Sequence, residues 1–100
     1  MFEHLRPTDA VGIPWYKRAD YPRIVQVMAD PELLPETFDK WQFKAEKMEA
    51  LFRREGRNPI RVPLDPEKFV AWCARYGCDV DATGRRAFAA DFENWPGTKH

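Results

Sequence analysis

The chain has 100 residues, and its 16 lysines and arginines balance its 16 aspartates and glutamates. This length fits one domain with a single core, to which seven Phe, four Trp and three Tyr add bulk. Charge is balanced locally too: residues 1–56 carry 9 basic and 10 acidic side chains, and residues 57–100 carry 7 and 6. The balanced net charge therefore argues against nonspecific electrostatic binding to nucleic acid or to an anionic membrane.

No apolar run approaches the roughly 20 residues that a membrane-spanning helix needs. The N-terminus lacks the basic-then-apolar layout of a signal peptide. Two cysteines, Cys73 and Cys78, are too few for a disulfide framework, so we expect both to be free thiols. We therefore expect a cytoplasmic protein with no membrane partner.

The first predicted element is a short strand within the irregular residues 1–19. Val11, Ile13 and Trp15 alternate with Gly12 and Pro14, as in a half-buried strand. Because proline has no N–H to give to a neighbouring strand, Pro14 confines this strand to a sheet edge.

A first helix follows, with Asp20 expected as its N-cap and Pro22 in its first turn. The pair Asp30-Pro31 ends it, since a residue before proline avoids helical geometry. We expect Asp30 also to cap a single turn through Leu34. The apolar face of this helix comprises Tyr21, Ile24, Val25 and Met28.

The second helix is the longest, starting near Pro35 to Thr37 and running to Glu55, with Gly56 as the residue after its end. Phe43 and Leu51 lie beside its apolar face and would widen it into an association patch if exposed. That face is a narrow line, named here the aromatic stripe: Phe38, Trp41, Ala45, Met48 and Phe52.

A turn at Asn58-Pro59 leads into a second strand, Ile60 to Leu64. A lone strand cannot satisfy its backbone groups, so this one needs a partner. The partner is either the segment around Ile13 or the same segment of a second copy.

Two more helices complete the chain. Asp65 and Pro66 open the third, which Gly77 ends, and its apolar face comprises Phe69, Trp72, Cys73 and Tyr76. The last helix begins after Asp79 or Asp81 and runs to about Asn94.

The sequence thus predicts one α+β domain over residues 1–100, mostly helical, with about four α-helices packed on a small two-stranded β-ribbon. The predicted core comprises Trp15, Ile24, Val25, Met28, Phe38, Trp41, Met48, Phe52, Val62, Phe69, Trp72, Cys73, Phe88 and Phe92.

Residue types that most enzymes need are scarce. The chain has no serine, its two histidines (His4 and His100) lie near the ends, and its five glycines form no phosphate-binding loop. Cys73 falls on an apolar helix face, which indicates a buried side chain and not a nucleophile. The cysteines lack zinc-site spacing. We favour a non-catalytic role and expect no catalytic residue, cofactor or metal.

Two groups of side chains could bind a partner. Arginines near the end of the long helix could hold phosphate, although they also suit the helix dipole and solvation. Cations beside aromatic residues are typical of single-stranded nucleic-acid binders, although the aromatic ring could instead pack inward. The candidates are Arg53, Arg54, Arg57 and Arg61 in the first group, and Trp15, Tyr16, Lys17 and Arg18 in the second.

The order of motifs resembles a family of small uncharacterised bacterial proteins of about this length. The resemblance spans nearly the whole chain and implies a free-standing bacterial protein, but no activity or site. It rests on Gly12-Ile13-Pro14-Trp15-Tyr16, Asp20-Tyr21-Pro22, Met28-Ala29-Asp30, Thr37-Phe38-Asp39 with Trp41, Arg61-Val62-Pro63-Leu64-Asp65-Pro66, and Phe69 with Trp72-Cys73.

We therefore expect a non-catalytic protein-interaction or self-associating domain, whose partner is another protein or a second copy in a homodimer. One alternative is a nucleic-acid-associated accessory protein that uses the arginine cluster. The other is a small-molecule binder or unusual enzyme, with Trp15, Tyr16, Asp65 or Cys73 around a cleft.

Overall fold

The computed structural model describes residues 10–91, and its elements confirm the predicted α+β class. Four α-helices accompany a two-stranded sheet in this part of the chain. In chain order the elements are β1 (Ala10–Trp15), η3 (Arg18–Asp20), α1 (Tyr21–Val27), η4 (Pro31–Leu33), α2 (Phe38–Arg54), β2 (Asn58–Pro63), α3 (Pro66–Tyr76) and α4 (Ala82–Ala90).

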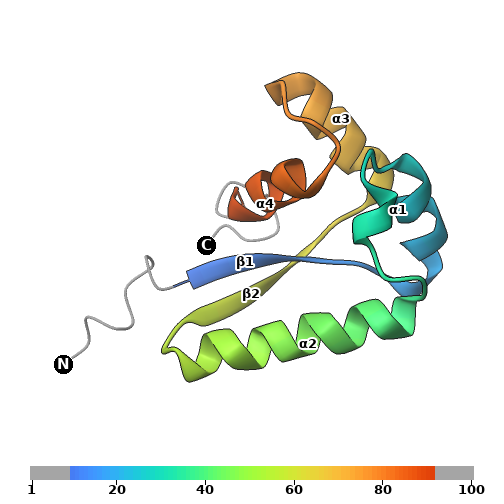
Figure 1. The fold of residues 1–100 in the computed structure, drawn as a ribbon. Coiled ribbons are helices and arrows are strands. Elements are labelled where there is room, and N and C mark those ends of the chain that lie inside the picture. The colour runs from blue at the N-terminus through green and yellow to red at the C-terminus, as the bar shows by residue number, and fades with distance from the viewer. Residues whose placement is uncertain (1–9, 92–100) are drawn as a thin grey trace.

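The two strands pair within the chain and run parallel, from Ala10 opposite Asn58 to Trp15 opposite Pro63. The partner of the second strand is therefore the segment around Ile13 of the same chain. Parallel strands need a long crossover connection, which α1 and α2 supply here. Figure 1 shows α2 along one side of the strands, with α1, α3 and α4 gathered on the other.

Helices cover both faces of this small sheet. On one face, Trp15 of β1 packs edge-on against Trp41 of α2, with ring centroids 5.0 Å apart. On the other face, Gly12 lies so close to α4 that a Cβ there would overlap the Ala89 carbonyl oxygen. A residue without a side chain is what allows this approach.

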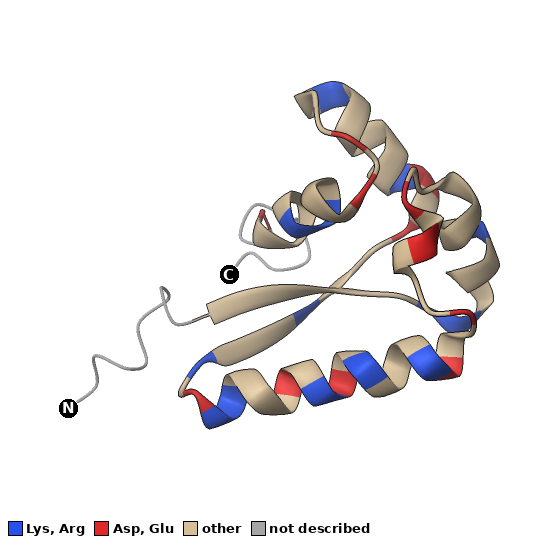
Figure 2. Ribbon diagram, in the orientation of Figure 1, with Lys and Arg blue, Asp and Glu red and all other residues tan. Residues whose placement is uncertain are grey.

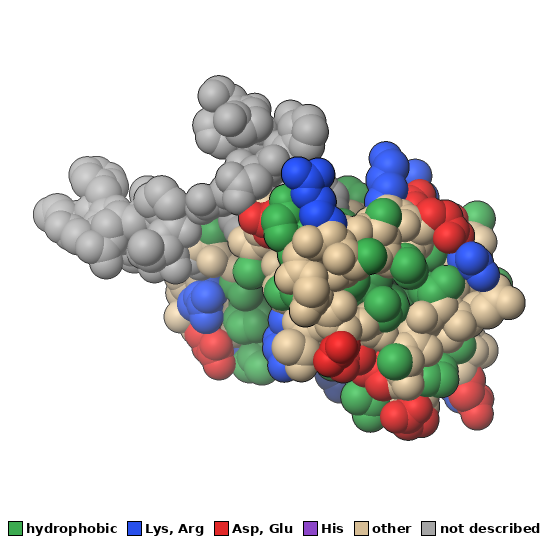
Figure 3. Space-filling view, turned by 90° about the horizontal axis from the view of Figure 1, so that it is seen from above, with side chains coloured by type: hydrophobic (Ala, Val, Ile, Leu, Met, Phe, Trp, Pro, Cys, Tyr) green, Lys and Arg blue, Asp and Glu red, His purple; other side chains and the backbone are tan. Residues whose placement is uncertain are grey.

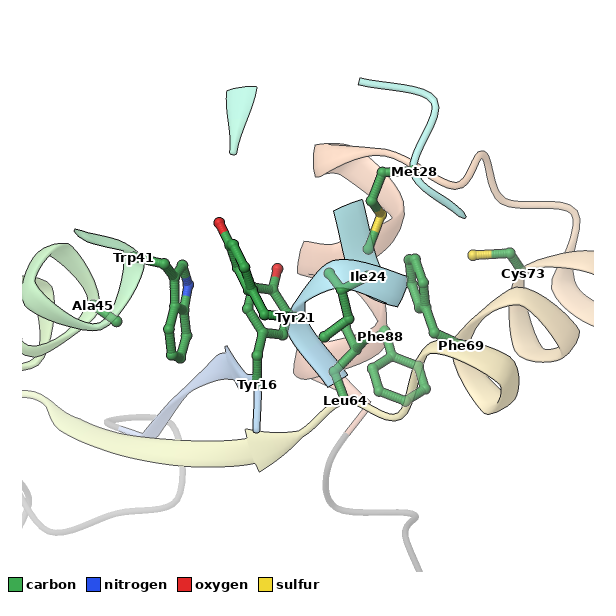
Figure 4. Packing of buried hydrophobic residues seen from close by; sticks show 10 residues of the cluster. All are labelled: Tyr16, Tyr21, Ile24, Met28, Trp41, Ala45, Leu64, Phe69, Cys73 and Phe88. Atoms are coloured by element: carbon green, nitrogen blue, oxygen red, sulfur yellow. The ribbon is translucent and has the colours of Figure 1, made fainter. Parts of the chain in front are cut away.

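The buried core lies between the sheet and the helices (Figure 4). Phe69 and Ile24 are fully buried. The core prediction is confirmed for Ile24, Met28, Trp41, Val62, Phe69, Cys73 and Phe88, whereas Trp15, Val25, Phe38, Phe52 and Trp72 are half-buried. Phe92 and the predicted helix end at Asn94 lie outside the described residues.

Two predicted inward-facing residues are wrong. Met48 is 48% exposed because it lines an open cleft beside β1, and Tyr76 is 57% exposed as the last residue of α3. Glu49, next to Met48, is buried instead and pairs with Arg61 of β2. Phe43 and Leu51 are both exposed, so the condition for a widened apolar surface on α2 is met.

Most predicted helix ends are confirmed by side-chain hydrogen bonds. The Asp65 carboxylate accepts from the Glu67 and Lys68 backbone N–H groups, and Thr37 and Asp81 cap α2 and α4 in the same way. Gly77 ends α3 with a φ of 70°, where residues other than glycine are strained.

Two predicted caps are wrong. Asp20 makes no side-chain capping bond, because the preceding turn η3 already gives it helical backbone angles. Asp30 makes no capping bond to η4 either, because its carboxylate reaches across the fold to Arg85. The second strand also begins two residues before its predicted start, at Asn58, and ends at Pro63.

Charged and apolar side chains alternate over the surface. Acidic and basic bands alternate along α2 (Figure 2), and hydrophobic side chains lie between charged ones on the face that carries α3 and α4 (Figure 3). None of the helices in the described part of the chain has the length and hydrophobicity to cross a membrane.

Candidate functional site

The candidate site is a cleft of about 400 Å³ between α2 and α4. Four consecutive residues of β1, from Val11 to Pro14, line it. Consecutive strand residues point to opposite faces, so a cleft that touches all four lies along the edge of the strand. The volume is typical of a ligand-binding pocket.

Apolar side chains form most of the wall. Ala45, Met48 and Phe52 contribute from α2, and the segment from Leu33 to Pro35 contributes from the loop that holds η4. Met48 and Leu33 are exposed, at 48% and 63% of their surface, so the apolar surface continues to the mouth of the cleft. An occupant that covers these side chains gains hydrophobic free energy.

The backbone hydrogen bonds show which way each β1 residue faces. The Leu64 N–H donates to the Trp15 carbonyl at 2.9 Å, so Trp15 turns its backbone groups toward β2. In a regular parallel ladder alternate residues do the same, so Val11 and Ile13 also turn their backbone N–H and carbonyl groups toward β2. Gly12 and Pro14 then face away from β2, into the cleft. The cleft therefore contains one N–H, of Gly12, and the carbonyls of Gly12 and Pro14.

The outer edge of β2 is different. By the same alternation, Pro59, Arg61 and Pro63 face away from β1. Two of these three residues have no N–H, so this edge is a poor template for another strand. The β1 edge adjoins the cleft of about 400 Å³, whereas on β2 only the last residue, Pro63, lines a smaller described pocket of about 220 Å³.

Tyr16 has the least exposed polar side chain of the cleft lining. It is only 4% exposed, and its hydroxyl makes no hydrogen bond with any described residue. Burial raises the pKa of Tyr16 to about 12, so the hydroxyl stays protonated at neutral pH. The neighbouring Tyr21 differs, because its hydroxyl donates to the Pro35 carbonyl at 2.6 Å.

Three cationic side chains complete the lining: Lys44 of α2, and Arg85 and Arg86 of α4. The Arg85 guanidinium donates to Asp30 at 2.9 Å, and both side chains are nearly buried. Lys44 and Arg86 form no ion pair within residues 10–91. No aspartate or glutamate lines the cleft among these residues, so its polar groups favour an occupant that accepts hydrogen bonds or carries negative charge.

Several of the predicted binding residues are covered or paired in the structure and are not free at the surface. Trp15 is half-buried beneath Arg61, whose guanidinium lies 3.9 Å from its ring centroid. Arg61 also donates twice to Glu49, at 2.6 and 2.8 Å, so its charge is neutralised. Tyr16 is only 4% exposed, so the face of its ring is not open for a nucleic-acid base to stack on it.

The remaining predicted cations lie at the two ends of α2. Arg18 pairs with Asp39 at 2.7 Å and lies over the Phe38 ring, and Lys17 is exposed beside it. At the other end Arg53 and Arg54 are exposed, and Arg57 lies over the Phe52 ring. The structure therefore brings Arg61 onto Trp15, but leaves Arg53, Arg54 and Arg57 at the opposite end of α2 from Lys17 and Arg18.

The cysteines have the predicted character. Cys73 and Cys78 are free thiols, and Cys73 is 1% exposed with its Sγ donating to the Asp79 carbonyl at 3.6 Å. Burial raises the pKa of the Cys73 thiol, which disfavours the thiolate. No group of three or more potential metal ligands occurs within residues 10–91.

Sequence reasoning named Tyr16 but missed the other groups of the cleft. Lys44, Arg85 and Arg86 look like ordinary helix-surface cations in the sequence, and no spacing marks them. Gly12 carried a usable signal, because a glycine between two apolar strand residues indicates close approach of another backbone or a ligand.

Comparison with protein-family models, with curated proteins and with solved structures found no match. The resemblance to small bacterial proteins therefore stays a prediction, and the geometry of the cleft carries the functional argument.

Proposed function

We propose that this chain is a non-catalytic protein-interaction domain that binds an extended segment of a partner protein in the cleft between α2 and α4. The segment adds to β1 as a third strand. The observation that supports this most directly is the outer edge of β1, where the backbone groups of Gly12 and Pro14 face an apolar cleft. Strand addition at an exposed sheet edge is a common mode of peptide recognition.

The dimensions of the cleft fit such a segment. Four residues of β1 line it, and a strand of equal length spans about 13 Å at about 3.3 Å per residue. Each backbone hydrogen bond adds about 0.5–1.5 kcal/mol, and burial of apolar side chains adds about 25 cal/mol per Å². After the cost of association and of ordering the segment, we expect a dissociation constant on the order of micromolar.

Other functions have less support. A cysteine nucleophile is disfavoured, since Cys73 is buried and its thiol pKa is raised. The nucleic-acid alternative is weakened because Glu49 neutralises Arg61, one of the four arginines expected to bind phosphate. A small molecule could occupy the same cleft, but its binding would not require the outward-facing backbone groups of β1.

The test is selection from a random peptide library against the full-length protein, followed by amide NMR titration with a selected peptide. We expect the largest chemical-shift changes at Gly12 and along the facing sides of α2 and α4. Shift changes confined to other surfaces, or failure of any peptide to bind, would contradict the proposal.

Methylation of the peptide backbone distinguishes strand addition from other modes. In a strand, alternate N–H groups point to the neighbouring strand. N-methylation of one alternate set should therefore abolish binding, while methylation of the other set leaves it within about threefold. Equal tolerance of both sets would exclude a strand.

Two matched variants locate the site. Met48→Glu places a charge on the exposed wall of the cleft, and we expect it to weaken peptide binding at least about tenfold. Phe43→Glu makes a similar change on α2 outside this cleft, at a side chain that is 63% exposed, and should leave affinity unchanged. Light scattering of both proteins tests the self-association alternative: a dimer that Met48→Glu dissociates would assign the cleft to a second copy.

A further inference from the structure

Beside the backbone groups of β1, the polar side chains of the cleft lining offer donors and positive charge without any carboxylate. From this one-sided lining and the unpartnered Tyr16 hydroxyl, we infer that the bound segment presents a carboxylate to Tyr16, Lys44 and Arg86. The inference rests on the proposed function and specifies the chemistry of the partner. The carboxylate belongs either to an aspartate or glutamate side chain or to the C-terminus of the partner.

Tyr16 is the first support for this inference. Its hydroxyl lies in a side chain that is 4% exposed, lines the cleft and has no hydrogen-bonding partner among residues 10–91. A buried polar group without a partner costs about 1–3 kcal/mol. An acceptor on the occupant removes that cost, and a carboxylate oxygen is the acceptor that forms the strongest bond to a neutral hydroxyl.

The distribution of charge is the second support. Asp30 neutralises Arg85, which therefore adds spare N–H donors but little net charge. Lys44 and Arg86 come from the two helices that flank the cleft, and neither is paired with a carboxylate in the described part of the chain. They supply two positive charges at the walls, and an occupant with one or two negative charges is complementary to them.

The experiment titrates three forms of a selected peptide into the wild-type protein. The forms are the parent peptide, the peptide with each Asp or Glu replaced by Asn or Gln, and the peptide amidated at its C-terminus. We expect one neutralised form to bind about tenfold or more weakly, and the form that does so identifies the source of the carboxylate. If no neutralised form binds more weakly than the parent, the inference is wrong and the proposed function stands. If no peptide binds at all, the proposed function itself fails.

Variants of the protein assign the contact. Tyr16→Phe deletes only the hydroxyl and should weaken binding of the parent peptide about tenfold while leaving the affinity of the neutral form unchanged. Lys44→Gln and Arg86→Gln should each weaken the parent peptide severalfold, with a loss that shrinks as salt is added. Lys47→Gln on α2, outside the cleft lining, is the control and should change nothing.

Urea unfolding of Tyr16→Phe checks that any loss of binding comes from the hydroxyl. Because the hydroxyl has no partner in the free protein, its removal should leave the free energy of unfolding unchanged or raise it. A clear loss of stability would show that the hydroxyl already has a structural partner, and the inference would lose its first support.

Discussion

Among residues 10–91, Asp30 and Arg85 form the ion pair in which both partners are buried. Both residues are less than one-tenth exposed, at 9% and 8%. The Arg85 guanidinium donates to Asp30 at 2.9 Å, and the Ala82 backbone N–H donates to the same carboxylate at 2.9 Å. The carboxylate therefore connects the segment between α1 and η4 to the first turn of α4.

Asp30→Asn keeps the shape of the side chain and removes its charge. Breaking a buried ion pair by removing one partner costs about 3–5 kcal/mol, because the other charge is left buried and unpaired. Asparagine can still accept one hydrogen bond, so we expect the lower end of this range, about 3 kcal/mol. That is a large part of the roughly 5–15 kcal/mol that stabilises a domain of this kind.

The same pair predicts a pH dependence. Burial raises the pKa of Asp30, but the hydrogen bonds from Arg85 and Ala82 together outweigh it, and the pKa lies below its ordinary value. A carboxylate with a lowered pKa stabilises the fold above its unfolded pKa of about 4, and this contribution is lost as the pH falls through the folded pKa. The difference in stability between wild type and Asp30→Asn should therefore shrink in acid.

Urea unfolding followed by tryptophan fluorescence, at about pH 7 and about pH 3, measures both effects. The matched control is Asp39→Asn, because Asp39 pairs with Arg18 at the surface, where their side chains are 73% and 65% exposed. Such pairs contribute about 0–1 kcal/mol. A loss at pH 7 for Asp30→Asn no larger than that of the control would refute this account of the buried pair.

Three further results are expected. Asp65→Ala should lower the free energy of unfolding by about 1 kcal/mol because it deletes a cap, whereas Asp20→Ala should change it by less than about 0.5 kcal/mol, and urea unfolding compares them. Gly12→Ala should cost about 1–3 kcal/mol by the same measurement, since the new methyl overlaps a backbone carbonyl of α4. Iodoacetamide should alkylate Cys78 before the buried Cys73, as peptide mass spectrometry will show; equal rates would contradict the burial of Cys73.

Local signals predicted the elements well, because caps and turns depend on residues within a few positions. Thr37, Asp65 and Asp81 each cap the helix that follows through N–H groups two or three residues away. Gly77 likewise adopts its left-handed backbone for a local reason. A rule that spans four residues can be applied to a sequence without knowing the fold.

The errors arose where a distant contact overrode a local rule. Asp30 has the position of a cap, yet its carboxylate pairs with Arg85, 55 positions away. Met48 continues the aromatic stripe, yet it lines the open cleft beside the β1 edge and is left exposed, while Glu49 is buried and bonded to Arg61. Helical periodicity gives the direction of a side chain, but only the packed fold decides what it meets.

The prolines connect the fold to the candidate site. Three of the six outward-facing positions of the sheet hold proline: Pro14 on β1, and Pro59 and Pro63 on β2. Each removes an N–H that could pair with another strand, as expected where a two-stranded sheet must resist aggregation. On β1 two outward N–H groups remain: that of Gly12 within the apolar cleft, and that of Ala10 outside the cleft lining. The β2 edge lacks an N–H at two of its three outward positions, whereas the β1 edge keeps the Gly12 N–H beside apolar walls, which favours strand addition at β1. That asymmetry could be recognised only once the register of the strands was known.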